Sequence, residues 1–371
     1  MERKGLMTPA KTPGGQRRYL VPELDDYRRK SSTFVAPQNP WSLALNRSAN
    51  QQPIAFEEQP ESLDFDFEND VAYIHDTHPA TPPDPRNTLN ELSGKEWLIE
   101  TKSVWFQKGL GAGHPHAKYE RQHPAPFSFQ DVGRLISFFT KPGESVLDPF
   151  AGVGSTTKAC ALAARKSTSI ELSSKWTSIA KKRVDEEVSP GTSASHTWHV
   201  GDARKVLPKL QTNSYDFVVT SPPYWAILAK PGDHKVKSER TQKGLTTRYS
   251  TLTNDLGNVE RYFDFRRELT SILLETARVL RCNRYMALIV SDFRHKSSFI
   301  SFHSDLIHDL NGARLGEHYR FVLQGTKILL QNHKKLYPYG YPFAYVENIH
   351  HQYILIFRKI PESKYQRNYE L

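Results

Sequence analysis

The sequence predicts an α/β fold in which helices cover both faces of a mostly parallel, seven-stranded sheet. Short strand-like runs with acids or glycines at their carboxyl ends alternate with segments of helical periodicity. The first run, Ser145-Val-Leu-Asp148, leads into a glycine loop and an Ala-rich helix at 157–164. Ligands of open α/β sheets bind beyond the carboxyl ends of the strands, so the residues after each run are candidate site residues.

The next three predicted strands also end in residues suited to a ligand. The strand at 167–172 carries Glu171, about 20 residues after the glycine loop, where such folds place a ribose-binding carboxylate. The strand at 196–202 ends in Gly-Asp, which places Asp202 to accept a hydrogen bond from an adenine amino group. The fourth, 215–219, runs directly into Thr220-Ser-Pro-Pro-Tyr-Trp225.

The glycine loop combines backbone freedom with small hydroxyl side chains. Gly152 and Gly154 let the backbone approach a ligand closely. Ser155 or Thr156 is expected to cap the helix that follows.

The segment Ser221-Pro-Pro-Tyr224 forms a fixed corner at the end of a strand. Proline locks φ and forces the preceding residue to be extended, so the corner cannot relax into a helix. Its oxygens are placed to accept hydrogen bonds from a planar amino group while Tyr224 stacks on the ring. Such bonds free the nitrogen lone pair to attack a methyl donor. The alternative interpretation is a proline-rich surface turn.

Regular periodicity resumes after this corner. A helix is expected at 259–280, with one buried face. That face comprises Phe263, Leu269, Ile272, Leu273, Ala277 and Leu280. A strand at 285–290, a helix at 299–310 and a strand at 319–323 follow.

These motifs resemble those of the amino-group DNA methyltransferases that use S-adenosylmethionine, in the N4-cytosine/N6-adenine family. Residues 148–156 resemble the cofactor motif of that family and residues 221–224 its catalytic motif. Residues 123–128, 134–136 and 141–144 resemble the segment before the cofactor strand, and 351–359 resemble the last strand of the sheet. The resemblance covers about residues 87–360 and implies a Rossmann-like class I methyltransferase whose last strand is antiparallel.

The resemblance also implies roles for individual residues. The catalytic residues would be Ser221, Pro222, Pro223 and Tyr224. The cofactor would contact Asp148, Phe150, Gly152, Gly154, Ser155, Thr156, Glu171, Asp202 and Ala203, together with Pro124 and Phe127. For Asp148, a role as a helix or loop cap is the alternative.

In this family Ser-Pro-Pro-Tyr usually accompanies methylation of cytosine N4, whereas Asp-Pro-Pro-Tyr usually accompanies adenine N6. The expected activity is therefore site-specific methylation of cytosine N4 in DNA, in a restriction-modification or related DNA-marking role. Three alternatives stay open: an N6-adenine DNA methyltransferase, an RNA or protein-glutamine methyltransferase, and a non-catalytic DNA-binding protein that retains the fold.

The charge balance favours a polyanionic partner. The net charge is +10 and the isoelectric point is about 9.3. We expect double-stranded DNA to be contacted by Lys230, Lys235, Lys237, Arg240, Lys243 and Arg248, although a solvated loop is the alternative. Target-recognition elements are expected in the loops 226–256 and 324–349. A cognate restriction endonuclease would act separately.

The remaining composition narrows the class of protein. Two cysteines, Cys160 and Cys282, exclude a disulfide framework, and neither is placed for the thiolate attack that cytosine C5 methylation needs. The histidines complete no ligand set, so no metal is assigned. No apolar stretch has the length of a membrane span, and we expect a soluble, cytoplasmic monomer.

Three regions are expected along the chain. Residues 1–86 are poor in hydrophobic periodicity and form a disordered or extended arm. Residues 87–360 form the catalytic domain, which opens with a helical lead-in at 87–97, and 361–371 form a tail.

Overall fold

The computed structural model describes residues 82–107, 116–120, 122–123, 127–225, 252–295, 298–331, 334 and 336–369. It also describes an antiparallel pair, β1 (Ala10–Lys11) and β2 (Arg17–Arg18). The chain divides into two units, Met1–His78 and Pro79–Leu371, and the architecture below belongs to the second. The boundary predicted at residue 86 stays a prediction.

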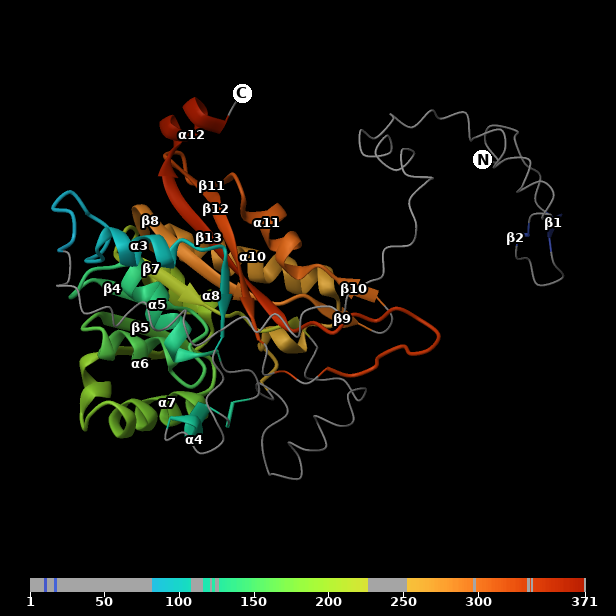
Figure 1. Ribbon diagram of the computed structural model, residues 1–371, viewed down its shortest axis with the longest axis horizontal. Coiled ribbons are helices and arrows are strands. Elements are labelled where there is room, and N and C mark those ends of the chain that lie inside the picture. Colours follow the sequence, from blue (N-terminus) through green and yellow to red (C-terminus); the bar gives the residue numbers. More distant parts are fainter. Residues whose placement is uncertain are drawn as a thin grey trace, which may run out of the picture. The chain divides into compact units, whose positions relative to one another are not determined.

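A twisted sheet forms the centre of the second unit (Figure 1). Seven strands run in the spatial order β6, β5, β4, β7, β8, β13, β12. Their bounds are β4 (Ser145–Asp148), β5 (Lys166–Glu171), β6 (Thr197–Val200), β7 (Tyr215–Thr220), β8 (Leu280–Val290), β12 (Tyr319–Leu330) and β13 (His351–Pro361). All are parallel except β13, which is antiparallel to both of its neighbours. The predicted α/β fold with an antiparallel last strand is confirmed.

Two short strands extend this sheet to nine. Strand β3 (Val104–Phe106) pairs in parallel with the end of β12, and β11 (Ala313–Leu315) pairs antiparallel with its beginning. The sequence did not predict them, because a three-residue strand carries too little alternation to be recognised. A separate hairpin joins β9 (Phe293–His295) to β10 (Ser298–Ile300).

Helices cover both faces of the sheet (Figure 1). On one face lie α5 (Phe129–Phe139), α6 (Ser155–Leu162) and α7 (Ser174–Glu187); on the other lie α8 (Ala203–Val206), α10 (Tyr262–Val279) and α11 (Phe302–Leu310). Successive side chains of a strand point to opposite faces of the sheet. In β7, Phe217 and Val219 face the α5 side, whereas Val218 faces the α10 side. All three side chains are fully buried.

The remaining helical elements are short. Within the described residues they are α3 (Gly94–Glu100), α4 (Ala117–Glu120), α12 (Glu362–Tyr369) and the 3₁₀ turns Thr192–Ser195, Leu207–Lys209 and Leu256–Asn258. Among the described residues, no helix combines the length and apolarity that crossing a bilayer requires.

Several boundaries differ from those predicted. The lead-in helix starts only at Gly94, because Ser93 and Glu96 form a capping box and the Asn87 side chain folds the preceding residues into a turn. Phe263, assigned to the buried face of α10, is 62% exposed. Strand β12 continues to Leu330, so only the later part of the predicted loop 324–349 is a loop.

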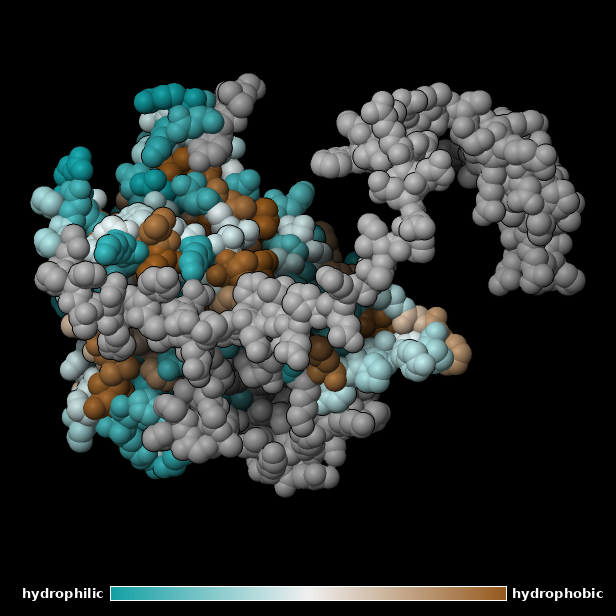
Figure 2. All heavy atoms as spheres, viewed as in Figure 1, coloured by the Kyte–Doolittle hydropathy of each residue, from teal (hydrophilic) through white to brown (hydrophobic). Residues whose placement is uncertain are grey.

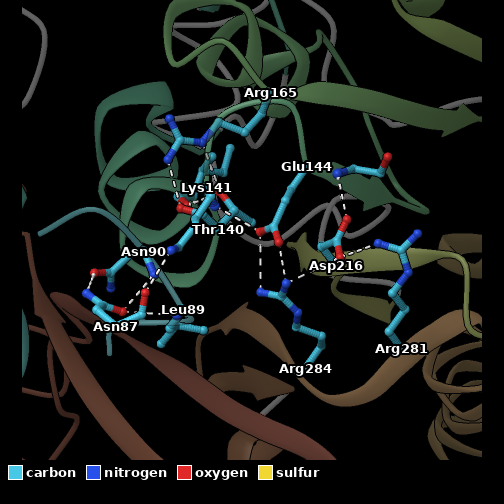
Figure 3. Close-up of polar contacts among 12 residues, drawn as sticks. Asn87, Leu89, Asn90, Thr140, Lys141, Glu144, Arg165, Asp216, Arg281 and Arg284 are labelled. Carbon is cyan, nitrogen blue, oxygen red and sulfur yellow. Dashed lines mark hydrogen bonds and ion pairs between the residues drawn. The ribbon is translucent and has the colours of Figure 1, made fainter. Parts of the chain in front are cut away.

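Charged side chains tie the strands together at the amino-terminal edge of the sheet (Figure 3). Arg284 of β8 pairs with Glu144, and Arg281 pairs with the buried Asp216 of β7. Asp216 also accepts a hydrogen bond from the Ser145 backbone at 3.0 Å. Ion pairs therefore stabilise the amino-terminal edge of the sheet, and the candidate site lies at the carboxyl-terminal edge.

Candidate active site

A pocket of about 900 Å³, including space open to solvent, lies at the carboxyl-terminal edge of the sheet. Residues that follow β4, β5, β6 and β7 meet in its lining. Of the predicted site residues, Phe127, Phe150, Gly152, Ser155, Glu171, Asp202, Ala203, Ser221, Pro222, Pro223 and Tyr224 all line it. The topology therefore brings the two central motifs into one cavity.

Asp148 lies beneath the glycine loop and outside the pocket lining. Its carboxylate accepts hydrogen bonds from Thr156 Oγ1 at 2.5 Å, Thr220 Oγ1 at 2.6 Å and the Phe150 backbone at 3.0 Å. Burial raises the pKa of Asp148 to about 6, against the lowering effect of these bonds. Asp148 joins the loop after β4 to the end of β7, as expected for the alternative interpretation, a loop cap.

The two glycines of the loop have different reasons to be glycine. Both have positive φ, 51° at Gly152 and 74° at Gly154. A Cβ at Gly154 would lie 2.9 Å from that of Ala180 in α7, so this position is required by helix packing. Gly152 lines the pocket, where a Cβ would meet the His123 ring at 3.4 Å.

The predicted caps of α6 are wrong. Gly154 occupies the N-cap position without a side-chain bond. Thr156 bonds Asp148 instead, and Ser155 receives a bond from Arg183.

Glu171 ends β5 and lines the pocket. Its two carboxylate oxygens accept hydrogen bonds from the backbone of Gly152 at 2.8 Å and of Ser173 at 2.9 Å. Burial raises the pKa of Glu171 to about 7. The backbone bonds fix the orientation of the carboxylate, and each oxygen retains lone-pair capacity for a hydroxyl donor.

Asp202 caps α8 and holds a charged neighbour. Its carboxylate accepts from the Arg204 backbone at 2.9 Å, from the Arg204 guanidinium at 2.8–3.1 Å and from Asn254 Nδ2 at 3.2 Å. Burial raises the pKa of Asp202, but the bonds from Arg204 outweigh it and leave the pKa below its usual value. This carboxylate is ionised and largely used by the protein itself.

The corner after β7 is held by its tyrosine. Every residue of β7 is buried, and the chain leaves it through Ser221-Pro-Pro-Tyr224. The Tyr224 hydroxyl is hydrogen-bonded to Ser221, to a backbone donor of Ser291 and to Gln352 Nε2, the last at 3.2 Å. The Tyr224 ring also meets Phe302 edge-on at 6.1 Å. The position of the ring is thereby fixed relative to β8 and β13.

Several lining residues were not singled out from the sequence. Trp176 lies at the start of α7 and contacts His123 edge-on at 4.9 Å. Asn254, Asp255 and Leu256 come from the loop after the catalytic corner. His123 stood within a quoted motif, but the Asn254–Leu256 segment carries no periodic or motif signal that could have found it.

Some predicted residues lie outside the described part of the chain. These are Pro124 and the six basic residues Lys230, Lys235, Lys237, Arg240, Lys243 and Arg248. Within the described residues, no group of three or more metal-ligating side chains occurs. Cys160 is buried in α6, and burial raises the pKa of its thiol. Cys282 lies in β8, shortly after α10 ends at Val279.

A buried charge network supports the glycine loop from below. Arg183 of α7 donates to Ser155 Oγ at 3.0 Å, to Glu120 at 2.8 Å and to Glu187 at 3.0 Å. Lys158 pairs with the same Glu187 at 2.7 Å. The Arg183 and Lys158 side chains are fully buried, so their charges depend on these partners.

Comparison with known proteins matches part of the chain to methyltransferases. A family described as DNA methylase matches residues 35–182, a span that holds the glycine loop, Glu171 and the first part of α7. The match covers less than half of the chain, and over these residues the chain is similar to DNA methylases. The match begins within the segment predicted to be an arm.

Two curated methyltransferases are similar to part of this chain. The type II methyltransferase M.MthZI of Methanothermobacter thermautotrophicus is 30% identical over 134 residues, which cover 34% of this chain and 38% of that protein. The type II methyltransferase M.BglI of Bacillus subtilis is 30% identical over 130 residues, covering 33% and 35%. The chain thus matches little more than a third of the length of each relative.

Solved structures give partial matches as well. TTHA0409 of Thermus thermophilus, crystallised with S-adenosyl-L-methionine, is 24% identical with a TM-score of 0.29, over 46% of this chain and 59% of that one. A TehB-like methyltransferase of Corynebacterium glutamicum that depends on the same cofactor is 13% identical with a TM-score of 0.33, over 62% and 86%.

The pocket fits S-adenosylmethionine, the cofactor implied by the family. Glu171 offers a fixed carboxylate for a ribose diol, and Asp202 with Asn254 offers polar groups beside apolar walls. Leu172, Leu256 and Ile272 supply those walls, which suit a purine ring. Gly152 leaves room where a side chain would project toward the pocket residue His123.

Proposed function

We propose that this protein is a DNA methyltransferase that transfers a methyl group from S-adenosylmethionine to the exocyclic N4 amino group of cytosine. The observation that carries the proposal is the single pocket shared by the glycine loop, Glu171 and the Ser221-Pro-Pro-Tyr224 corner. The preference for cytosine over adenine rests on Ser221, since the adenine N6 enzymes of the family usually have aspartate there.

The corner supplies acceptors at the place where an amino group must be held. Pro222 and Pro223 have no backbone N–H, so no amide donor competes at these positions with the amino hydrogens of the base. Ser221 Oγ contributes a hydroxyl acceptor at the pocket wall. Hydrogen bonds from the amino group to Ser221 Oγ and to the Pro222 carbonyl would draw the nitrogen toward tetrahedral geometry and free its lone pair.

The other residues of the pocket would position the cofactor and the target base and shield them from water. S-adenosylmethionine, when bound, supplies a methyl group on a positively charged sulfur that is already a good leaving group. Tyr224 presents an aromatic ring whose hydroxyl is tied down, which suits stacking on a base rotated out of the duplex. Catalysis by this chain therefore consists of positioning and electrostatic stabilisation.

The remaining roles are proposed with this activity. Double-stranded DNA is the proposed substrate, supported by the net charge of +10 and by the type II methyltransferases to which the chain is similar. The basic residues between Lys230 and Arg248 would contact its phosphates. A cytoplasmic monomer that marks DNA, with any endonuclease acting separately, completes the proposal.

The decisive experiment identifies the modified base. The purified protein is incubated with mixed-sequence duplex DNA and labelled S-adenosylmethionine, the DNA is digested to nucleosides, and the methylated nucleoside is identified by mass spectrometry. N4-methylcytosine is the expected product. N6-methyladenine would overturn the assignment of the base, while the proposed DNA methyltransferase activity would stand. Unmodified DNA together with tight cofactor binding would direct the search to RNA or protein substrates.

A further inference from the structure

The loop between β12 and β13 exposes an unusual number of aromatic side chains. Within residues 336–345, here called the aromatic turn, Tyr341 is 81%, Phe343 93% and Tyr345 84% exposed. Leu336 and Tyr339 are also exposed. Figure 1 shows this loop projecting from the body of the domain, and its projecting end is pale and tan in the same view of Figure 2. Contiguous exposed apolar groups of this kind mark interaction surfaces.

Hydrogen bonds hold the backbone of the aromatic turn in a defined conformation. Asn348 bridges it through two hydrogen bonds to the backbone of Tyr337, at 2.9 and 2.7 Å. The carbonyl of Gly340 accepts from the backbone of Phe343 at 2.7 Å and of Ala344 at 2.8 Å. A Cβ at Gly340 would lie 2.2 Å from the Ala344 carbonyl oxygen, so only glycine allows this close turn. The exposed rings are therefore displayed from an ordered backbone.

The sequence of the turn adds to this order. Aromatic residues occupy every second position from Tyr337 to Tyr345, and the positions between them hold only proline, glycine or alanine. Prolines restrict the backbone, and tyrosine and phenylalanine have few rotatable bonds. Binding through these rings consequently costs little conformational entropy.

Hydrogen bonds link the base of the β12–β13 loop to the catalytic corner. Gln331, the last residue before the loop, donates from its side chain to Gln352 at 3.2 Å, and Gln352 donates to the Tyr224 hydroxyl at 3.2 Å. The backbone of Gln331 also donates to the His350 carbonyl at 2.8 Å and closes the base of the loop. Because β12 is parallel to β8, its carboxyl end lies at the edge of the sheet that holds the pocket. The base of the loop is thus joined through Gln352 to Tyr224, which lines the pocket.

We propose that the aromatic turn inserts Tyr341, Phe343 and Tyr345 into the base stack of duplex DNA beside the target base. Side chains of this kind unstack base steps and stabilise an opened duplex, and every base offers a face on which a ring stacks. Charge favours the same partner, because residues 331–350 contain two lysines against one acid and the chain carries a net charge of +10. The inference rests on the proposed function and assigns these rings to its extrusion step.

The first test is binding of the full chain to mixed-sequence duplex DNA at several salt concentrations. A variant with Tyr341→Ala, Phe343→Ala and Tyr345→Ala is expected to bind about tenfold more weakly or worse. Because uncharged groups are removed, the slope of log K against log salt should not change. The matched control combines Leu98→Ala, Leu162→Ala and Phe263→Ala, which remove exposed apolar side chains elsewhere. Equal affinity of the turn variant and the wild type, or equal losses in turn variant and control, would refute the proposal.

The second test isolates base extrusion, on the sequence that the wild type methylates. The turn variant should methylate a paired duplex at least tenfold more slowly and recover most of the rate when the target base is mismatched, since a mismatched base is already easier to extrude. Equal losses on paired and mismatched DNA would overturn the wedge role. Absence of DNA methylation by the wild type would instead refute the proposed function, and the salt-dependent binding would still decide whether the turn contacts DNA.

Discussion

Near β4, β5 and β6, buried carboxylates accept hydrogen bonds from other parts of the protein. Near β8, β12 and β13, by contrast, aromatic side chains project into solvent. Asp148 and Glu171 each accept two or more internal hydrogen bonds. In the β12–β13 loop, by contrast, Tyr341 and Phe343 are more than four-fifths exposed.

This difference predicts which substitutions should lower stability and which should lower the rate of methyl transfer. A small cofactor with fixed polar groups is best met by a rigid, saturated wall, and a bulky polymer by surfaces that project into it. Substitutions on the first side should therefore alter folding and cofactor affinity. Those on the second should alter turnover and DNA binding while the fold persists.

The largest expected effect is on the cofactor side. Arg183→Met removes a fully buried charge and leaves Glu120 and Glu187 short of a partner, which should cost roughly 3–5 kcal/mol of unfolding free energy. Urea denaturation followed by circular dichroism measures it. Lys182→Met on the same helix is the control, because its side chain is 64% exposed and its ion pair is 3.7 Å long, so about 1 kcal/mol or less is expected. Similar losses in both variants would contradict the special importance of Arg183.

Next is the catalytic corner. Ser221→Ala should lower the rate of methyl transfer about 100-fold, because one oxygen that polarises the amino group is lost. Cofactor affinity, measured by calorimetry, and the denaturation midpoint should stay close to wild type. A parallel fall in rate and cofactor affinity would remove the distinction between the two sides.

A smaller effect separates packing from backbone strain in the glycine loop. Gly154→Ala and Gly143→Ala both force alanine into the left-handed region, at φ 74° and 80°, which costs about 1–2 kcal/mol each. Only Gly154→Ala also crowds Ala180, at 2.9 Å, whereas nothing lies within 4 Å of a Cβ at Gly143. Thermal unfolding should show Gly154→Ala to be less stable by roughly a further 1–3 kcal/mol. Equal stabilities of the two variants would mean that α7 shifts to make room for the new methyl group at no cost in stability.

The smallest effect is a pH dependence that belongs to Glu171. Its pKa is about 7 in the folded chain, and the ionised carboxylate is the better acceptor for ribose hydroxyls. Cofactor affinity should therefore rise about tenfold between pH 6 and pH 8, as calorimetry can measure. Glu171→Gln should abolish this rise.

The same pKa has a consequence of opposite sign for folding. A folded-state pKa above the ordinary value of 4.5 means that the native state keeps a proton which the unfolded chain releases. Stability from this group is thus present below pH 4.5 and is lost as the pH rises to about 7. The Glu171→Gln variant should show a flatter stability profile across that range.

Sequence patterns predicted the sheet and the ends of its first four strands well, because an acid, a glycine or a proline stands at or just after the end of each strand. They predicted poorly whatever depends on contacts between distant segments. Asp148 has the same sequence setting as a ligand-binding acid, and only the approach of Thr220 from another strand shows it to be internal. Asn254 reaches the pocket from a loop without periodicity, and Phe263 fits a helical stripe that extends beyond the core.

The edge strand β12 is covered in two places. Strand β11 pairs with Tyr319–Phe321 and β3 with Ile328–Leu330, and the pairing with β13 is irregular between Leu323 and Gly325, in the span left between them. Long, flat, open strands act as templates that recruit other chains into intermolecular sheets. The opposite border, β6, has only four residues. Both borders of this sheet therefore guard against edge-to-edge aggregation, which matters for a protein that must expose aromatic rings elsewhere.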